Sequence, residues 1–123
     1  AIFVEKDSRA FQVLQENIKK CRYESETELF RTDVARAVKG LMKRDIVIDY
    51  LFVDPPYHKA EYYEFVAQLA DAGKLSDDAI ILCEHVKTLT LPEAYGAFTL
   101  TRRETYGETI ISVYRKEEGE VVD

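Results

Sequence analysis

Short apolar runs alternate with helix-like repeats through the first half of the chain. Residues 2–4 and residues 29–30 are predicted to form strands, the first of them buried. Polar residues that can cap a helix follow each strand: Asp7 or Ser8 after the first, and Asp33 after the second. The apolar residues of the two predicted helices recur three or four positions apart, and they are Phe11, Leu14, Ile18, Val34, Ala37, Val38 and Leu41. This half of the chain therefore predicts two successive βα units.

A third unit is centred on the uninterrupted apolar run of residues 50–53. Such a run is typical of a central parallel strand that is covered on both faces, and residues 54–57 end it sharply. A helix follows, for which Gly73 can provide the C-terminal cap, and residues 79–83 predict another buried strand. The residues of that helix expected to face the sheet are Tyr62, Phe65, Val66 and Leu69.

The pattern changes after the loop around Pro92. Residues 98–103 and 109–115 are rich in β-forming residues, and Gly107 lies between them, so they predict an antiparallel hairpin. Alternating βα units closed by a hairpin indicate an α/β fold with a mostly parallel sheet. In such a sheet ligands bind at the carboxyl ends of the strands, so the residues just after each parallel strand are the candidates for function.

Composition places the chain among soluble globular proteins but raises a question about its partner. The chain has 123 residues, of which 46% are hydrophobic and 33% are charged. We therefore predict one domain over residues 1–116 and an acidic, frayed tail over residues 117–123. No secretory leader or membrane span is visible, so a cytoplasmic location is expected. Cys21 and Cys83 are expected to be reduced thiols in small apolar positions. The net charge of −6 argues against a broad phosphate-binding surface.

Two acids follow the first two predicted strands. A carboxylate at such a position, here Glu5, can accept hydrogen bonds from the vicinal hydroxyls of a ribose. Asp33 could accept a hydrogen bond from an adenine amino group, while the backbone of Val34 contacts the edge of the ring. Either acid can also be explained without a ligand, because strand ends are solvated and Asp33 is a good helix cap. Taken together, the two acids indicate a nucleoside site.

The segment Asp54-Pro55-Pro56-Tyr57 is the most specific feature of the sequence. The amino group of a nucleic-acid base is a poor nucleophile, because its lone pair is delocalised into the ring. The Asp54 carboxylate and the Pro55 carbonyl can accept both amine hydrogens and so direct the lone pair at an electrophilic methyl group. The prolines fix the backbone, and Tyr57 offers a face on which an extruded base can stack. The alternative is that the two prolines only end a strand and start a helix.

This segment, placed after a buried strand, resembles motif IV of the methyltransferases that act on amino groups of bases. Other segments are similar to one branch, the RsmD family, which methylates guanine N2 in 16S ribosomal RNA of the small subunit; they are residues 3–7, 49–57, 80–85, 106–107 and 110–114. The resemblance implies a Rossmann-like class I methyltransferase fold with S-adenosyl-L-methionine as the methyl donor. The implied cofactor-binding residues are Glu5, Asp33, Val34 and Asp54, and the implied catalytic residues are Asp54, Pro55, Pro56 and Tyr57.

The sequence departs from the family pattern at its front. Family members carry a strand and a glycine-rich loop before the segment that starts at Ala1, and the five glycines here include no Gly-x-Gly pair. We therefore expect an N-terminally truncated core that is inactive alone. The expected partner is small-subunit ribosomal RNA, either naked or in an assembling ribosomal particle. The family's N-terminal region is basic and is expected to supply much of the RNA contact, which would explain why the remaining core is acidic. No metal site is visible in the sequence, so neither a metal nor a membrane is expected as a partner.

Other interpretations remain open at this point. Methyltransferases of DNA adenine N6 and of protein glutamine N5 share related forms of motif IV, and a chain of this length could also be an inert folding core. A nicotinamide-dependent dehydrogenase would place an acid after the second strand, but it leaves residues 54–57 unexplained and needs a glycine-rich loop. His58 and His85 have no identifiable acid or nucleophile partner, so neither is assigned a catalytic role.

Overall fold

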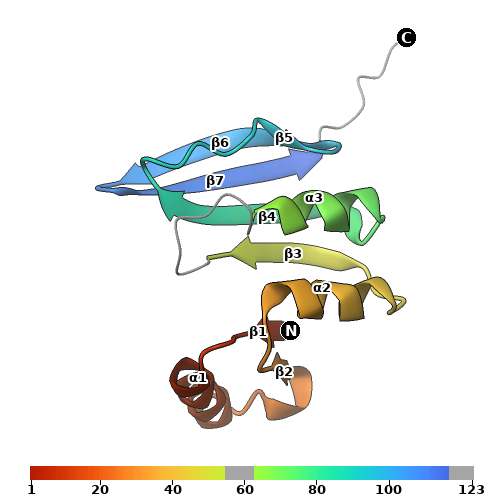
Figure 1. Cartoon of the computed structure of the whole chain (residues 1–123), viewed down its shortest axis with the longest axis vertical. Coiled ribbons are helices and arrows are strands. Elements are labelled where there is room, and N and C mark those ends of the chain that lie inside the picture. The colour runs from red at the N-terminus through yellow and green to blue at the C-terminus, as the bar shows by residue number, and fades with distance from the viewer. Residues whose placement is uncertain (55–62, 117–123) are drawn as a thin grey trace. The chain divides into compact units, whose positions relative to one another are not determined.

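The computed structural model describes residues 1–54 and 63–116, and the chain divides into two compact units, Ala1–Arg44 and Asp45–Asp123. Figure 1 shows the helices and strands of each unit in chain order. The expected catalytic residues 55–57 lie outside the described residues, as does His58. None of the described helices is long and apolar enough to cross a membrane.

The first unit consists of two βα pairs, whose strands form a parallel two-stranded sheet. Its elements are β1 (Ile2–Val4), α1 (Ser8–Lys20), the 3-10 helix η1 (Glu24–Glu26), β2 (Glu28–Phe30) and α2 (Val34–Met42). Asp7 caps α1 by accepting a hydrogen bond from the Ala10 amide at 2.7 Å. Asp33 caps α2 in the same way, accepting from the Arg36 amide at 2.8 Å. The strands, helices and caps predicted for this half of the chain are confirmed.

The second unit contains a sheet of five strands in the order β3-β4-β7-β6-β5. Its elements are β3 (Ile48–Val53), α3 (Glu64–Asp71), β4 (Leu75–Val86), β5 (Ala94–Tyr95), β6 (Phe98–Tyr106) and β7 (Thr109–Lys116). Strands β3 and β4 are parallel, and the remaining pairs are antiparallel. Gly107, with φ of 61°, makes the turn of the predicted hairpin, which is confirmed. The antiparallel part of the sheet is larger than the sequence pattern indicates, because β5 also joins it.

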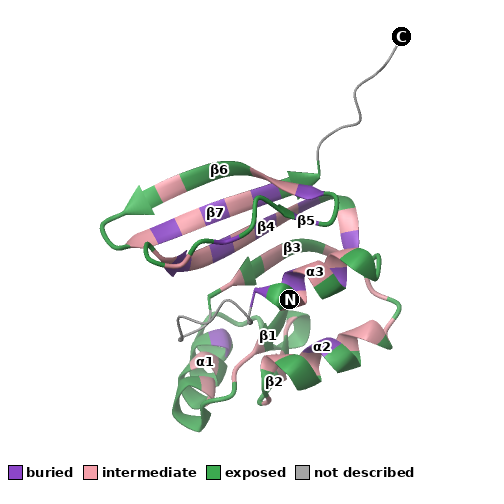
Figure 2. Cartoon of the chain, turned by 45° about the horizontal axis from the view of Figure 1, so that its top comes forward, coloured by how far each residue is buried: buried purple, intermediate pink, exposed green. Residues whose placement is uncertain are grey.

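Packing in the second unit follows the two-residue period of its strands. The buried residues near the carboxyl end of β4 are Ala79, Ile81, Cys83 and His85, and the side chains between them are only partly covered. Figure 2 shows the same alternation along β7. Val66 and Leu69 of α3 are buried as well, so this helix and one face of the sheet form the core. Burial raises the pKa of the Cys83 thiol to about 12, which keeps it protonated and structural.

The burial predicted for two strands is wrong. In β1, Ile2 and Phe3 are 36% and 40% exposed, and in β3, Tyr50 and Phe52 are 58% and 52% exposed. Among the described residues β1 pairs only with β2, and β3 only with β4. Each strand therefore lies at an edge within its own unit, where an apolar run is not enclosed as it would be in the middle of a sheet.

Two smaller predictions also differ from the structure. Of the helix residues expected to face the sheet, Val66 and Leu69 are buried, Phe65 is half-buried, and Tyr62 lies outside the described residues. Tyr63, directly before α3, provides a buried ring at 2% exposure. Cys21 is exposed, because it lies at the C-cap of α1 where the chain leaves the helix.

Candidate active site

The first unit brings Glu5 and Asp33 to the same edge of its sheet. Val4 pairs with Phe30 in a parallel register, and the Glu5 amide donates a hydrogen bond to the Phe30 carbonyl at 3.0 Å. Both acids therefore follow the carboxyl ends of paired parallel strands, where ligands bind in α/β folds. The Glu5 side chain is oriented by the Asp7 amide, which donates to its Oε1 at 3.1 Å.

Asp33 already has a structural partner in the chain. Its Oδ1 accepts the hydrogen bond that caps α2, so the helix-cap interpretation is confirmed, and the adenine interpretation stays a prediction. Val34 is the first residue of α2, and amides in the first turn of a helix lack partners within the helix. An amide donor can bond the edge of an adenine ring, while one carboxylate accepts from the adenine amino group and the other accepts from a ribose diol. The chemistry of these donors and acceptors therefore fits an adenosine.

The second unit places Asp54 at the carboxyl edge of the parallel pair β3 and β4. The last pair in the register is Val53 with Cys83, so Asp54 leaves β3 at the level of Glu84 in β4. Asp54 is exposed, and Glu84 is partly buried. The predicted position of Asp54, directly after a parallel strand, is confirmed. The roles predicted for residues 55–57 stay predictions, since these residues lie outside the described part of the chain.

Buried polar side chains gather at the same end of β4. The Tyr63 hydroxyl donates a hydrogen bond to the Glu84 carbonyl at 2.6 Å. The edge of the Tyr63 ring packs against His85, with 6.3 Å between the ring centroids and 80° between the planes. Ser112 of β7 is fully buried, and its Oγ lies 2.8 Å from His85 Nε2.

The partners of His85 indicate the donor and acceptor roles of its ring nitrogens, and the surroundings of Tyr63 change the pKa of its hydroxyl. His85 Nδ1 lies 3.1 Å from the Val86 carbonyl, which can only accept, so a neutral ring carries its hydrogen on Nδ1 and accepts from Ser112 through Nε2. Burial, reinforced by the nearby Cys83, Asp54 and Glu84 groups, raises the pKa of Tyr63 to about 12. The Tyr63 hydroxyl therefore remains a donor at neutral pH.

No local pattern in the sequence points to this polar set. Ser112 is 27 residues from His85, and only the antiparallel register of β4 and β7 brings them together. One signal was available: the two-residue period of β4 places His85 on the same face as Ile81 and Cys83, where a histidine needs polar partners. His85 thus has a hydrogen-bond partner that is not an acid, the hydroxyl of the fully buried Ser112.

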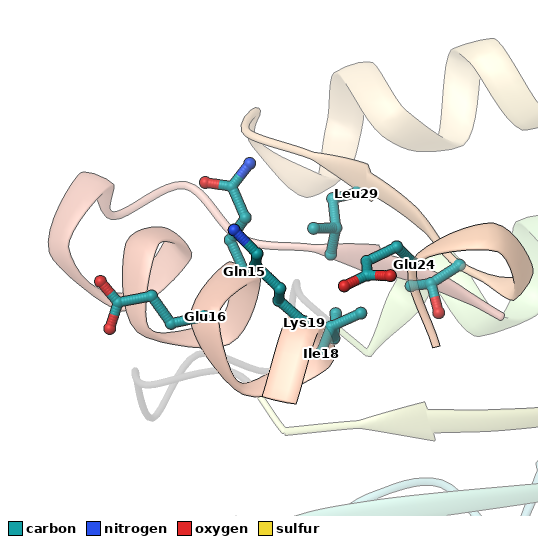
Figure 3. Close-up of a pocket in the computed structure, with 7 residues that line it drawn as sticks. Gln15, Glu16, Ile18, Lys19, Glu24 and Leu29 are labelled. Atoms are coloured by element: carbon teal, nitrogen blue, oxygen red, sulfur yellow. The ribbon is translucent and has the colours of Figure 1, made fainter. Parts of the chain in front are cut away.

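Two hollows in the described residues are separate from the candidate positions. In the first unit a hollow of about 410 Å³ lies among α1, η1 and β2, with Ile18, Lys19, Glu24 and Leu29 in its lining (Figure 3). In the second unit a hollow of about 530 Å³ is lined by side chains of the sheet, such as Tyr50 and Arg102. Neither lining includes a predicted site residue, so the candidate positions in each unit are defined by the ends of its parallel strands. Within the described ranges, no three His, Cys, Asp or Glu residues are grouped to hold a metal ion.

Comparisons with known proteins show the family of the chain. The family model described as conserved hypothetical protein 95 matches residues 1–115. The "Putative rRNA methyltransferase YlbH" of Bacillus subtilis (strain 168) is 32% identical over 115 residues, which are 94% of this chain and 62% of that protein. The "Ribosomal RNA small subunit methyltransferase D" of Escherichia coli (strain K12) is 28% identical over 83 residues, 68% of this chain and 42% of that protein. The chain belongs to the RsmD family. It spans less than two thirds of the length of either relative.

Solved structures agree with the RsmD assignment at the level of the fold. A conserved hypothetical protein of Streptococcus pyogenes is 29% identical with a TM-score of 0.82, over 95% of this chain and 71% of that one. The SAH-bound methyltransferase PaMTH1 of Podospora anserina is 17% identical with a TM-score of 0.65, over 95% of this chain and 60% of that one. The RsmD-family chain thus has the α/β, Rossmann-like fold of S-adenosylmethionine-dependent methyltransferases, as the resemblance in its sequence implies.

Proposed function

We propose that the whole protein transfers a methyl group from S-adenosylmethionine to the exocyclic N2 amino group of a guanine in small-subunit ribosomal RNA. Residues 1–116 belong to its catalytic core, and the reaction takes place in the cytoplasm on naked RNA or an assembling ribosomal particle. The observation that carries the proposal is the position of Asp54 at the carboxyl edge of β3 in a chain of the RsmD family. The Escherichia coli relative, named as a methyltransferase of small-subunit ribosomal RNA, supports the substrate.

The cofactor is held by the acids of the first unit in this proposal. Glu5 accepts hydrogen bonds from the ribose hydroxyls, Asp33 accepts one from the adenine amino group, and the Val34 backbone contacts the ring edge. Support comes from the parallel register of β1 and β2, which brings the ends of both strands to one edge. S-adenosylmethionine, when bound, supplies an electrophilic methyl group.

Catalysis in this proposal depends mainly on the position of the target amine. The Asp54 carboxylate and the Pro55 carbonyl accept its two hydrogens, so that the nitrogen lone pair is directed at the methyl donor. Pro56 keeps the backbone rigid, and Tyr57 stacks on the extruded guanine. Because the amine proton can leave to water after the transfer, the reaction requires no strong general base, and neither His58 nor His85 is assigned that role.

The first experiment measures transfer of a labelled methyl group by the whole protein to ribosomal RNA, DNA and protein in parallel. We expect Asp54→Ala to lower turnover at least about a hundredfold, because it removes an acceptor that acts mainly in the transition state. Cofactor affinity should change far less. Asp49→Ala is the matched control, since Asp49 is also an exposed aspartate of the same stretch but lies near the opposite end of β3.

The pattern of products distinguishes the substrate classes. Label in small-subunit ribosomal RNA, recovered as N2-methylguanine, supports the proposal. Label in DNA adenine or in protein glutamine would replace it with one of the related methyltransferase activities. Near-normal turnover of Asp54→Ala, or an equal loss in Asp49→Ala, would rule out the role assigned to Asp54.

A further inference from the structure

Tyr63, the residue directly before α3, is connected through side-chain contacts to the middle of the sheet. Its hydroxyl is bonded to the Glu84 carbonyl, its ring contacts His85, and His85 is bonded to Ser112 of β7. Tyr63, His85 and Ser112 are each at most 5% exposed. One continuous set of contacts therefore extends from β7 across β4 to the residue that precedes α3.

The location of this set is specific to one end of the sheet. The register of β3 and β4 ends at Val53 and Cys83, so the Glu84 carbonyl lies just past the paired part of the two strands. Backbone acceptors in a partly buried position need a donor, and Tyr63 provides it there. Tyr63 is thus bonded to Glu84, the residue that follows the last paired residue of β4, just as Asp54 follows the last paired residue of β3.

Apolar side chains would fill the same core space without requiring partners. Buried polar groups are tolerated where each one is bonded, and both ring nitrogens of His85 have partners here. A fully bonded polar set fixes the relative positions of its members more narrowly than apolar contacts do. The position of Tyr63 at the end of β4 is therefore fixed by the geometry of its hydrogen bond to the Glu84 carbonyl.

We propose that Tyr63, supported by His85 and Ser112, is a positioning residue for methyl transfer: it fixes the end of β4, with which β3 is paired up to Val53, and so keeps Asp54 in place. This inference rests on the proposed function of Asp54. Tyr63 acts through its hydrogen bond to the Glu84 carbonyl and does not touch the target base. Loss of the hydroxyl should therefore lower the rate of the chemical step and leave cofactor binding unchanged.

The chain offers a matched control for this bond. Tyr114 is also buried, and its hydroxyl also donates to a backbone carbonyl at 2.6 Å, but the acceptor is Pro92. Tyr114 pairs with Ile81 in the register, further from the end of β4 than Ser112. Tyr63→Phe and Tyr114→Phe each remove one hydroxyl bonded to a carbonyl, so a general effect on stability should be similar in both.

Two measurements test the proposal. In the whole protein, Tyr63→Phe should lower kcat about tenfold, the value of one well-placed hydrogen bond, with KM for S-adenosylmethionine within about twofold of wild type. Tyr114→Phe should keep kcat within about twofold at a similar shift in melting temperature. In the 123-residue chain, NMR should show a changed Asp54 amide resonance in Tyr63→Phe and an unchanged one in Tyr114→Phe.

The results distinguish failure of the Tyr63 proposal from failure of the proposed function. If both variants lose turnover equally, or neither does, Tyr63 has only a structural role and the proposal is wrong. An unchanged Asp54 amide in Tyr63→Phe would also overturn it. If the wild-type whole protein transfers no methyl group, the proposed function fails instead, and the NMR comparison still decides whether Tyr63 positions Asp54.

Discussion

Asp33 illustrates how one side chain can serve both the fold and a ligand. One carboxylate oxygen accepts the hydrogen bond that starts α2. The role proposed for the residue in adenine binding requires an acceptor as well, and a carboxylate has several acceptor positions on its two oxygens. A substitution to alanine would remove both roles at once, so a residue that keeps the cap is needed to separate them.

Serine is such a residue, because its hydroxyl is as good a helix cap as aspartate. In the whole protein we expect Asp33→Ser to leave the melting temperature almost unchanged and to weaken cofactor binding by about tenfold, the loss of one hydrogen bond to a charged group. Asp7→Ser is the control, since Asp7 caps α1 with the same geometry. Calorimetric titration with S-adenosylmethionine measures the affinity of each variant for the cofactor. Equal affinities for the two variants would leave Asp33 as a helix cap alone.

The candidate site could be predicted from the sequence only where it depends on neighbours in the chain. Asp54 follows an apolar run and precedes two prolines, so its position at the end of a strand is visible in the sequence. The bond between His85 and Ser112 depends on the register of β4 and β7, and the bond from Tyr63 to Glu84 joins residues that are 21 positions apart in the chain. Neither contact has a local signal.

At the scale of helices and strands, local signals also explain which predictions are correct. The caps of α1 and α2 and the positive φ of Gly73 are properties of a few adjacent residues, and all three are confirmed, as is the hairpin whose turn contains Gly107. Strand length and burial depend on distant partners. β4 begins at Leu75, four residues before its predicted start, and its polar Asp77 is bonded to Lys116 at the end of β7. An apolar run cannot show whether it lies in the middle of a sheet or at its edge, which is why the burial of β1 and β3 was not predictable.

An ion pair connects two elements of the first unit and gives a pH-dependent prediction. Arg44, just after α2, donates to both carboxylate oxygens of Glu28 in β2, at 2.8 and 2.9 Å. The hydrogen bonds from Arg44 hold the pKa of Glu28 below its ordinary value. Because the folded-state pKa lies below the unfolded one, the pair contributes stability above the unfolded pKa and loses it as the pH falls through the folded pKa.

We expect Arg44→Ala to raise the pKa of Glu28 toward its ordinary value. The adjacent Lys43→Ala removes the same formal charge, but the ion pair of Glu28 is with Arg44, so this variant should leave that pKa nearly unchanged. NMR titration of the Glu28 carboxyl carbon in the three proteins measures the effect. Both groups are exposed, so added salt should reduce the difference. The same Glu28 pKa in wild type and Arg44→Ala would show that the pair does not persist in solution.

At the scale of the whole molecule, the core is distributed very unevenly between the two units. Of the buried apolar residues in the described parts of the chain, only Ile18 and Val38 belong to Ala1–Arg44, and all others belong to the second unit. The sequence pattern does not predict this difference between the units, because it shows which residues are apolar but not how many of them are buried in the folded chain. The amphipathic helices α1 and α2 thus have few buried side chains within their own unit.

This distribution predicts that the second unit is the more stable one and folds without the first. A helix of 13 residues and one of 9, on a sheet of two three-residue strands, have too little buried apolar surface to offset the loss of chain entropy. We expect residues 45–123 alone to show a β-rich circular dichroism spectrum and a cooperative thermal transition, and residues 1–44 alone to show neither. In the intact chain, hydrogen exchange should be slowest at the paired amides of β4 and β7 and faster by at least about tenfold throughout β1 and β2, because local opening is least costly where few residues are buried. Equal protection in β1 and β7 would show that the two units unfold together, and a cooperative transition of residues 1–44 alone would show that the first unit has a core that its buried residues do not account for.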